Sequence, residues 1–241
     1  MARKQVTLVV VRHGQATHIL ENFRKEDLVK TKEELPIMNS PLTAEGRRQA
    51  SLVAQRLATT KFDLGLASDL ARAWDTAQAI VEANPSLGGV EECRLLRERN
   101  AGIFECEREI HNAQCTVEES IQNRDLLTWK IPEGESVVDL RNRARQFLEL
   151  VQAKAMALEV EAPTILVASH YVWMHEFYRI LAEQASVLTK EERERKPRTP
   201  NTGVDQYTLT TVMEEDGQPR LENIAFDLIS CGQHLEANST F

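Results

Sequence analysis

The chain has 241 residues, of which 42% are apolar, and its formal net charge is −8 at pH 7. This length is sufficient for one α/β domain with a sizeable core, so we expect a single domain over residues 1–241. The longest apolar runs have the length of a strand, which argues against a membrane-spanning helix. Nucleic-acid-binding proteins usually carry a basic face, so the negative charge argues against that class.

The cysteines and the N-terminus indicate a reducing compartment. Four cysteines, at positions 93, 106, 115 and 231, form no Cys-x-x-Cys pair and are expected to be reduced thiols. Residues 1–4 lead into an apolar run without a signal-peptide pattern, so we expect a cytoplasmic protein. Cys106, His111 and Cys115 fit no usual zinc spacing and lack an evident fourth ligand, so we expect no metal site.

The first predicted element is a strand over Val6–Val11, followed by Arg12-His13-Gly14. The run is continuous and rich in valine, as in a strand that is buried on both faces. Buried parallel strands place functional residues at their carboxyl ends. Arginine offers a fork of donors that matches phosphate oxygens, and histidine can act as acid, base or nucleophile near neutral pH. The tripeptide therefore suits an anionic substrate, but it is short and needs support from elsewhere.

A charged, irregular stretch then occupies residues 18–39. Two interpretations stay open: a solvated loop or short helix, or a lid inserted over the pocket, since the stretch begins soon after His13. Thr43 is the expected N-cap of a helix from Ala44 to about Thr59.

A second apolar run over Phe62–Ala67 predicts another strand, and Ser68 or Asp69 is expected to cap the helix after it. Arg72 falls in the first turn of that helix. It therefore follows the carboxyl end of a predicted strand, as Arg12 does.

A short strand is predicted over Glu92–Leu96 and leads to Glu98. Residues 101–129 are hard to assign, and we expect helices there that cover the site. Ser136 is typical of the N-cap of a long helix reaching about Glu159, so we interpret the segment 133–136 mainly as a helix start.

The run Thr164–Ala168 predicts a third buried strand, which ends at Ser169-His170 and is followed by a helix over Tyr171–Gln184. If this strand is parallel to the first, His13 and His170 emerge at the same edge of the sheet. Strands over Val204–Val212 and Leu221–Leu228 follow, with a hairpin turn between them, and residues 230–241 are expected to form a loose tail. The alternation of elements predicts a three-layer α/β/α sandwich with a mostly parallel central sheet.

These pieces together resemble the histidine phosphatase superfamily, which includes cofactor-dependent phosphoglycerate mutases and fructose-2,6-bisphosphatase. The resemblance runs from about Val6 to Thr211. It rests on Arg12-His13-Gly14, Ser40-Pro41-Leu42-Thr43-Ala44-Glu45-Gly46, Ser68-Asp69-Leu70-Ala71-Arg72-Ala73 with Thr76-Ala77, Leu96-Arg97-Glu98, Pro132-Glu133-Gly134-Glu135-Ser136, Ala168-Ser169-His170 and Asn201-Thr202-Gly203.

The resemblance implies a phosphoglycerate mutase-like fold and a set of catalytic roles. His13 would be the nucleophile that forms a phosphohistidine, and Arg12 and Arg72 would bind the phosphoryl oxygens. His170 would add a further donor and charge. These groups can replace the metal that other phosphoryl-transfer enzymes use, so neither metal nor cofactor is expected.

The general acid has more than one candidate. Glu98 has the place of the proton donor for the leaving group, and a nearby phosphate disfavours the charged form of a carboxyl group. The alternatives are that Glu98 is a surface ion-pair residue, or that Glu105 is the acid.

Two positions depart from the family pattern. Ile19 stands where an asparagine often binds phosphate, for which Asn22 or Gln15 could compensate. Tyr171 stands where glycine usually follows the second histidine, and its side chain could narrow the pocket.

The function that the sequence favours is a metal-independent phosphatase acting on a phosphorylated small molecule, with a phosphoprotein as an open alternative. Phosphoglycerate mutase-type phosphoryl transfer is a second interpretation, but we identify no basic cluster dedicated to a substrate carboxylate. A non-catalytic phosphate-binding or protein-interaction domain of the same fold is a third.

Overall fold

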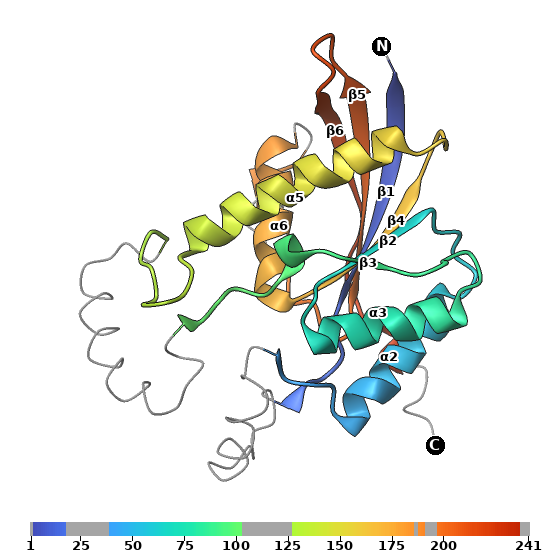
Figure 1. Ribbon diagram of the computed structural model, residues 1–241, viewed down its shortest axis with the longest axis vertical. Helices are drawn as coiled ribbons and strands as arrows, with labels where there is room; N and C mark the ends of the chain where they lie inside the picture. The colour runs from blue at the N-terminus through green and yellow to red at the C-terminus, as the bar shows by residue number, and fades with distance from the viewer. Residues whose placement is uncertain (1, 18–38, 103–126, 186–187, 191–196, 237–241) are drawn as a thin grey trace.

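A mixed β-sheet forms the centre of the computed structural model, which describes residues 2–17, 39–102, 127–185, 188–190 and 197–236 (Figure 1). Within these residues the sheet has six strands in the order β3-β2-β4-β1-β5-β6. Their bounds are β1 Arg3–Arg12, β2 Leu64–Ala67, β3 Glu91–Glu92, β4 Thr164–Ser169, β5 Val204–Met213 and β6 Pro219–Cys231.

Strands β1, β2, β3 and β4 are mutually parallel, whereas β5 pairs antiparallel with β1 and β6 pairs antiparallel with β5. The last two strands are joined by a tight turn, in which Glu214 N–H donates to the Gln218 carbonyl at 2.9 Å. Gly217 in this turn has a φ of 80°, a conformation that glycine adopts without steric cost. The expected mostly parallel sheet with a C-terminal hairpin is therefore confirmed.

Helices cover both faces of the sheet, which gives the three layers (Figure 1). Helices α5 (Val137–Ala157) and α6 (Tyr171–Gln184) lie on one face, and α2 (Ala44–Leu57) and α3 (Ala71–Ala83) lie on the other. Strand β1 shows why: Val6, Leu8 and Val10 join the core under α5 and α6, while Val9 and Val11 join the core under α2. Because successive side chains of β1 point to opposite faces and both faces are covered by helices, this run has to be apolar on both of them.

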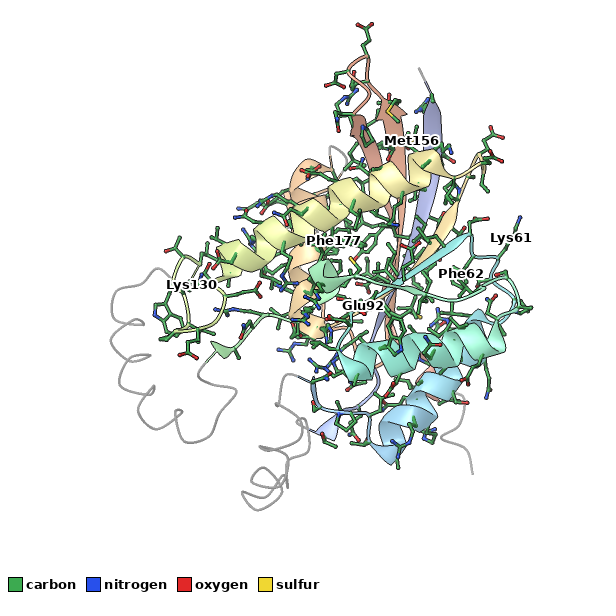
Figure 2. All side chains as sticks on the ribbon, in the orientation of Figure 1. Lys61, Phe62, Glu92, Lys130, Met156 and Phe177 are labelled. Atoms are coloured by element: carbon green, nitrogen blue, oxygen red, sulfur yellow. The ribbon has the colours of Figure 1, made fainter. Side chains whose placement is uncertain are left out.

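Aromatic rings fill much of the core between the sheet and α5 and α6. Phe177 from α6, labelled in Figure 2, stacks on Trp173 at 4.8 Å between ring centroids. It also meets the rings of Phe147 from α5 and Tyr207 from β5 edge to face. These contacts tie α6, and with it the segment that begins at His170, to both α5 and the sheet.

The helix starts are mostly as expected. Thr43 caps α2, its hydroxyl accepting from Gly46 N–H, and Ser136 caps α5 through a reciprocal pair with Asp139. The expected capping of α3 was wrong, because its N-cap is Leu70 without a side-chain hydrogen bond. The Ser68 hydroxyl is bonded to His170 at 2.9 Å and accepts from Leu70 N–H at 3.3 Å, and the Asp69 carboxylate accepts from Arg97 at 2.7 Å.

The strand expected over Glu92–Leu96 was also wrong. Only Glu91–Glu92 form β3, and the 3₁₀ helix η3 follows over Arg94–Leu96. The Cys93 N–H still donates to the Ala67 carbonyl at 2.7 Å, but the Leu96 N–H then turns back to the Cys93 carbonyl. This turn places the Leu96 side chain in the core, where it is fully buried.

The expected loose tail from residue 230 is a further correction. Strand β6 continues through Cys231, and a short helix, α8, spans Gln233–Glu236. His234 in this helix hydrogen-bonds the Thr202 hydroxyl at 3.0 Å and an Arg56 guanidinium nitrogen at 3.2 Å, which anchors the segment to α2.

The possible lid, apart from Asn39, and nearly all of the helices expected over 101–129 fall outside the described residues.

Candidate active site

The two histidines lie side by side at one edge of the sheet. Strands β1 and β4 are neighbours and parallel, and their register pairs Arg12 with Ser169. The next residues along each strand are His13 and His170, so their rings meet at 5.1 Å between centroids, tilted by 55°. Both are buried, with 2% and 0% exposure. The convergence that the sequence predicted is therefore present.

The ring of His13 is oriented by two hydrogen bonds. Its Nδ1 lies 2.7 Å from the Gly14 carbonyl oxygen, which can only accept, so Nδ1 carries the ring proton. Its Nε2 accepts from the Nε–H of Arg72 at 3.3 Å. The imidazole is consequently neutral, with the Nε2 lone pair turned toward a cation, the tautomer that a nucleophilic Nε2 needs.

The backbone of His13 is fixed by residues from distant motifs. Its carbonyl oxygen accepts from the Asn201 side chain at 3.1 Å and from Thr202 N–H at 3.2 Å. Thr202 adopts a φ of 54°, which is uncommon for a threonine and is held by His234. The motif Asn201-Thr202-Gly203 therefore acts here as a clamp on the strand end that carries His13.

Close approach of two glycines completes this clamp. A Cβ atom on Gly14 would lie 2.4 Å from the Gly46 carbonyl oxygen, and one on Gly46 would lie 1.9 Å from the Gln15 carbonyl oxygen. The Gly14 N–H donates to the Thr76 hydroxyl at 3.1 Å. Glycine is thus required where the start of α2 packs on the backbone after His13.

Arg12 is half-buried and lies beside Tyr171. Its guanidinium carbon lies 5.0 Å from the centre of the Tyr171 ring, and its Nη1 donates to the Thr199 carbonyl at 2.9 Å. Burial lowers the pKa of Arg12, while the charge of Glu98 opposes that shift. The Nε of Arg12 is buried and has no hydrogen-bond partner among the described residues. The tyrosine that departs from the family pattern thus supplies a ring beside this arginine.

A buried carboxyl group that the sequence analysis missed lies behind Arg12. Asp205 on β5 accepts from Ser230 N–H at 2.7 Å and from the Tyr207 hydroxyl at 3.0 Å. The Thr199 hydroxyl, from the residue whose carbonyl holds Arg12, donates to Asp205 at 3.5 Å. Burial raises the pKa of Asp205 to about 6, although these donors oppose the shift. An aspartate inside an otherwise uncharged strand was the signal that could have revealed it.

Glu98 lies at the N-terminus of α6. Its Oε1 accepts from the N–H groups of Arg99 at 2.8 Å and Trp173 at 3.2 Å, and its Oε2 accepts from Val172 N–H at 3.1 Å. Because α6 begins directly after His170, these bonds join Glu98 to the helix start at the second histidine. The first N–H groups of a helix lack partners within it, so a carboxylate is well placed there.

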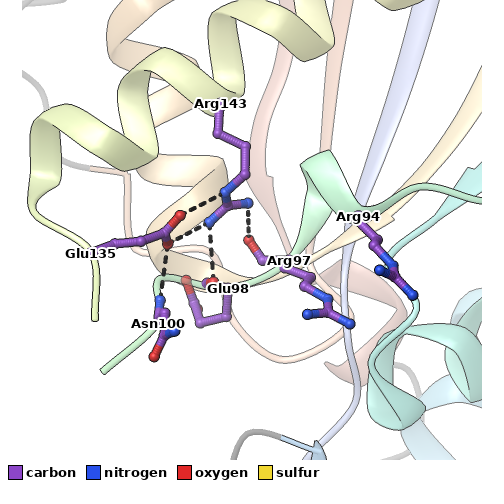
Figure 3. A pocket seen from close by; sticks show the side chains of 6 residues that line it. All are labelled: Arg94, Arg97, Glu98, Asn100, Glu135 and Arg143. Atoms are coloured by element: carbon purple, nitrogen blue, oxygen red, sulfur yellow. Dashed lines mark hydrogen bonds and ion pairs between the residues drawn. The ribbon is translucent and has the colours of Figure 1, made fainter. Parts of the chain in front are cut away.

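A cavity of about 260 Å³ opens beside Glu98 (Figure 3). The residues that line it are Arg94, Arg97, Glu98, Asn100, Glu135 and Arg143.

Several sequence expectations fall outside the described residues, namely those on Ile19, Asn22 and Glu105. Gln15 is described, and its side-chain oxygen accepts from the Thr43 hydroxyl at 2.8 Å, so it is engaged at the start of α2. In the part of the chain that the structure describes, no cluster of three or more His, Cys, Asp or Glu side chains could hold a metal ion. No helix in that part is both long and apolar enough to cross a membrane.

Comparison with known proteins identifies the class. The model of the histidine phosphatase superfamily (branch 1) matches residues 8–222, and the chain belongs to this superfamily. A probable phosphoglycerate mutase, GpmB, of Yersinia enterocolitica is 40% identical over 115 residues, which cover 46% of this chain and 51% of the relative. The chain thus matches about half the length of this relative.

Three further proteins are similar over nearly the whole chain. Fructose-2,6-bisphosphatase TIGAR of Xenopus tropicalis is 23% identical over 278 residues, covering 97% of each chain. The solved structure of a mycobacterial glucosyl-3-phosphoglycerate phosphatase is 21% identical, with a TM-score of 0.62, and covers 91% of this chain and 98% of its own. The solved structure of a phosphoglycerate mutase from Bacillus anthracis is 22% identical, with a TM-score of 0.60, and covers 91% of this chain and 92% of its own, which confirms the phosphoglycerate mutase-like fold that the motifs implied.

Proposed function

We propose that this protein hydrolyses phosphomonoesters through a covalent phosphohistidine on His13. The observation that carries the proposal is the state of the His13 ring, whose Nδ1 proton is directed at the Gly14 carbonyl, so that Nε2 keeps its lone pair. An unprotonated nitrogen beside Arg72 and His170 is suited to attack a phosphorus atom.

The phosphoryl group is bound by Arg12, Arg72 and His170 together with His13. The buried Nε–H of Arg12, unpartnered among the described residues, suits a phosphoryl oxygen. Arg72 moves its Nε–H from His13 to the phosphoryl group as the Nε2–P bond forms. His170, whose Nε2 is hydrogen-bonded to the Ser68 hydroxyl, adds a further donor. The charge that a metal would otherwise supply comes from these side chains.

Glu98 acts as general acid and then as general base. A general acid donates from its protonated form, and in this proposal the Glu98 carboxyl group is the proton donor in the substrate complex. It passes that proton to the leaving alkoxide. The resulting carboxylate then accepts a proton from the water that cleaves the phosphohistidine, which restores both His13 and Glu98.

The substrate in this proposal is a small phosphorylated molecule, and the names of the relatives TIGAR and glucosyl-3-phosphoglycerate phosphatase support it. A cytoplasmic setting is part of the proposal and suits Cys93 and Cys231, which are free thiols. The GpmB relatives favour mutase activity as the second candidate. The two differ in whether the phosphoryl group passes to water or to a second organic hydroxyl group.

The test is a single-turnover experiment with a radiolabelled phosphoester, run with and without a chelator. We expect acid-labile, alkali-stable label on the wild-type protein and release of inorganic phosphate at the same rate in chelator. His13→Ala should lose both the label and turnover. His175→Ala is the matched control, because this histidine of α6 pairs with Glu176. Full turnover in His13→Ala, or turnover that depends on an added divalent ion, would contradict the proposal.

A further inference from the structure

The segment that carries Glu98 has little regular structure of its own. After η3 ends at Leu96, residues 97–100 belong to no helix or strand. Backbone carbonyl groups in such a segment need partners from elsewhere, because buried polar groups without hydrogen bonds are costly. The position of Glu98 therefore depends on the side chains that bind this backbone.

Arg143 of α5 binds the backbone on the N-terminal side of Glu98 and at Glu98 itself (Figure 3). Its Nη1 donates to the carbonyl oxygens of Leu95 at 2.9 Å and Arg97 at 2.6 Å. Its Nη2 donates to the Glu98 carbonyl oxygen at 3.2 Å. One rigid guanidinium group thus fixes three carbonyl groups of the segment.

Glu135 orients Arg143 and binds the other side of the segment. Its two oxygens accept from the Nε and Nη2 of Arg143 at 2.9 and 2.7 Å. Its Oε2 also accepts from Asn100 N–H at 3.0 Å, and its own N–H donates to the Asn100 carbonyl at 2.9 Å. Backbone groups on both sides of Glu98 are therefore held by one ion pair, drawn in Figure 3.

Capping of α5 does not account for Glu135. Ser136 and Asp139 form the complete capping box at the start of this helix. The carboxylate of Glu135 is directed instead toward Arg143 and Asn100, with only 22% of the side chain exposed. The sequence interpretation of segment 133–136 as mainly a helix start holds for Ser136 and does not explain Glu135.

We propose that Arg143 and Glu135 are a positioning pair that places the carboxyl group of Glu98 for proton transfer. The proposal rests on the general-acid role of Glu98 proposed above. Neither residue is assigned contact with the reacting atoms. Their effect passes through the backbone to Glu98, and from its carboxyl group to the first turn of α6, where Val172 and Trp173 donate to it.

The first experiment compares Arg143→Met with Arg141→Met. Both arginines lie on α5 and are similarly buried, with 15% and 14% side-chain exposure, but Arg141 pairs with Glu176 instead. Turnover of glycerol 2-phosphate, whose leaving group is an alkoxide, is compared with turnover of p-nitrophenyl phosphate, which needs no proton donor. We expect Arg143→Met to lose roughly 10- to 100-fold more on the alkyl ester. Arg141→Met should affect both substrates equally.

A double variant tests whether Arg143 acts through Glu98. In a Glu98→Gln background, Arg143→Met should cause no further selective loss on glycerol 2-phosphate, because the acid is already absent. Glu135→Gln should show a weaker selective loss on glycerol 2-phosphate. This variant takes the place of Arg143→Met in the test if Arg143→Met does not fold. Equal losses on both substrates in Arg143→Met and Glu135→Gln, with Glu98→Gln selective, would overturn the proposal.

Amide hydrogen exchange gives a readout that does not depend on activity. The N–H groups of Arg99, Val172 and Trp173 bond to the Glu98 carboxyl group and should exchange faster in Arg143→Met than in the wild type or Arg141→Met. Unchanged exchange at these three amides would show that Arg143 does not hold Glu98. If Glu98→Gln loses activity equally on both substrates, the proposed general-acid role of Glu98 is wrong. Amide hydrogen exchange then decides by itself whether Arg143 and Glu135 hold Glu98 in place.

Discussion

Glu98 is the proposed general acid, and the leaving group of the substrate tests this role. A nitrophenolate leaves without help, whereas an alkoxide needs a proton. Glu98→Gln should therefore slow glycerol 2-phosphate by about 10²–10⁴-fold and p-nitrophenyl phosphate far less. Steady-state kcat/KM values on both substrates measure this. Equal losses would mean that Glu98 only shapes the site, and Glu105 would then be tested as the acid in the same way.

Asp205 is the buried carboxyl group most open to a test by pH. Its pKa is raised to about 6 by burial, above the ordinary aspartate value, so between about pH 4 and 6 the folded protein keeps a proton that the unfolded chain releases. Its contribution to stability is thus present below this range and is lost as pH rises through it.

In the variant Asp205→Asn the side chain is neutral at every pH, so we expect the loss of stability with rising pH to disappear. The free energy of unfolding of the wild type relative to Asp205→Asn should fall by roughly 2–3 kcal/mol between pH 4 and 7. Urea unfolding at several pH values measures the difference. Parallel curves for the two proteins would show that Asp205 releases its proton over the same pH range in the folded and unfolded states and makes no such contribution.

At the scale of elements, the contact between α2 and the backbone after His13 is the tightest point near the site. Gly46→Ala would place a Cβ atom 1.9 Å from the Gln15 carbonyl oxygen, so the helix start has to move away from Gly14 and Gln15. We expect the free energy of unfolding to fall by about 1–3 kcal/mol, as in other overpacked cores, and turnover to be reduced.

The matched control for this prediction is Gly88→Ala, because a Cβ atom there meets nothing within 4 Å. Thermal unfolding and p-nitrophenyl phosphate turnover of the two variants give the comparison. A Gly46→Ala protein as stable and active as Gly88→Ala would mean that α2 can shift without disturbing His13.

At the scale of the whole molecule, we propose a single domain over residues 1–241. The sheet is shared by strands from both ends of the chain, since β1 lies between β4 and β5. Unfolding one half would expose the core of the other, so one cooperative transition is expected. Tryptophan fluorescence, which includes the fully buried Trp173, and far-ultraviolet circular dichroism should give coincident urea midpoints. Two separated transitions would contradict a single domain.

The buried strands, most helix bounds and the meeting of the two histidines could be predicted from the sequence, because periodicity and strand ends are local signals. The run Val6–Val11 predicted a strand buried on both faces, and the parallel pairing of β1 with β4 brings His13 to His170. The start of α3 and the end of β3 were not determined locally. Ser68 and Asp69 bind His170 and Arg97, partners that the chain supplies from distant positions.

Only the folded structure shows how the proposed catalytic groups are held. Arg143 reaches carbonyl groups more than forty residues away along the chain, and Asp205 stands behind Arg12 through Thr199. Every residue has the same backbone carbonyl group, so no sequence motif indicates which side chain will bind it. The pattern of residues therefore indicates which groups meet at a sheet edge, while their orientation and protonation follow only from the packed fold.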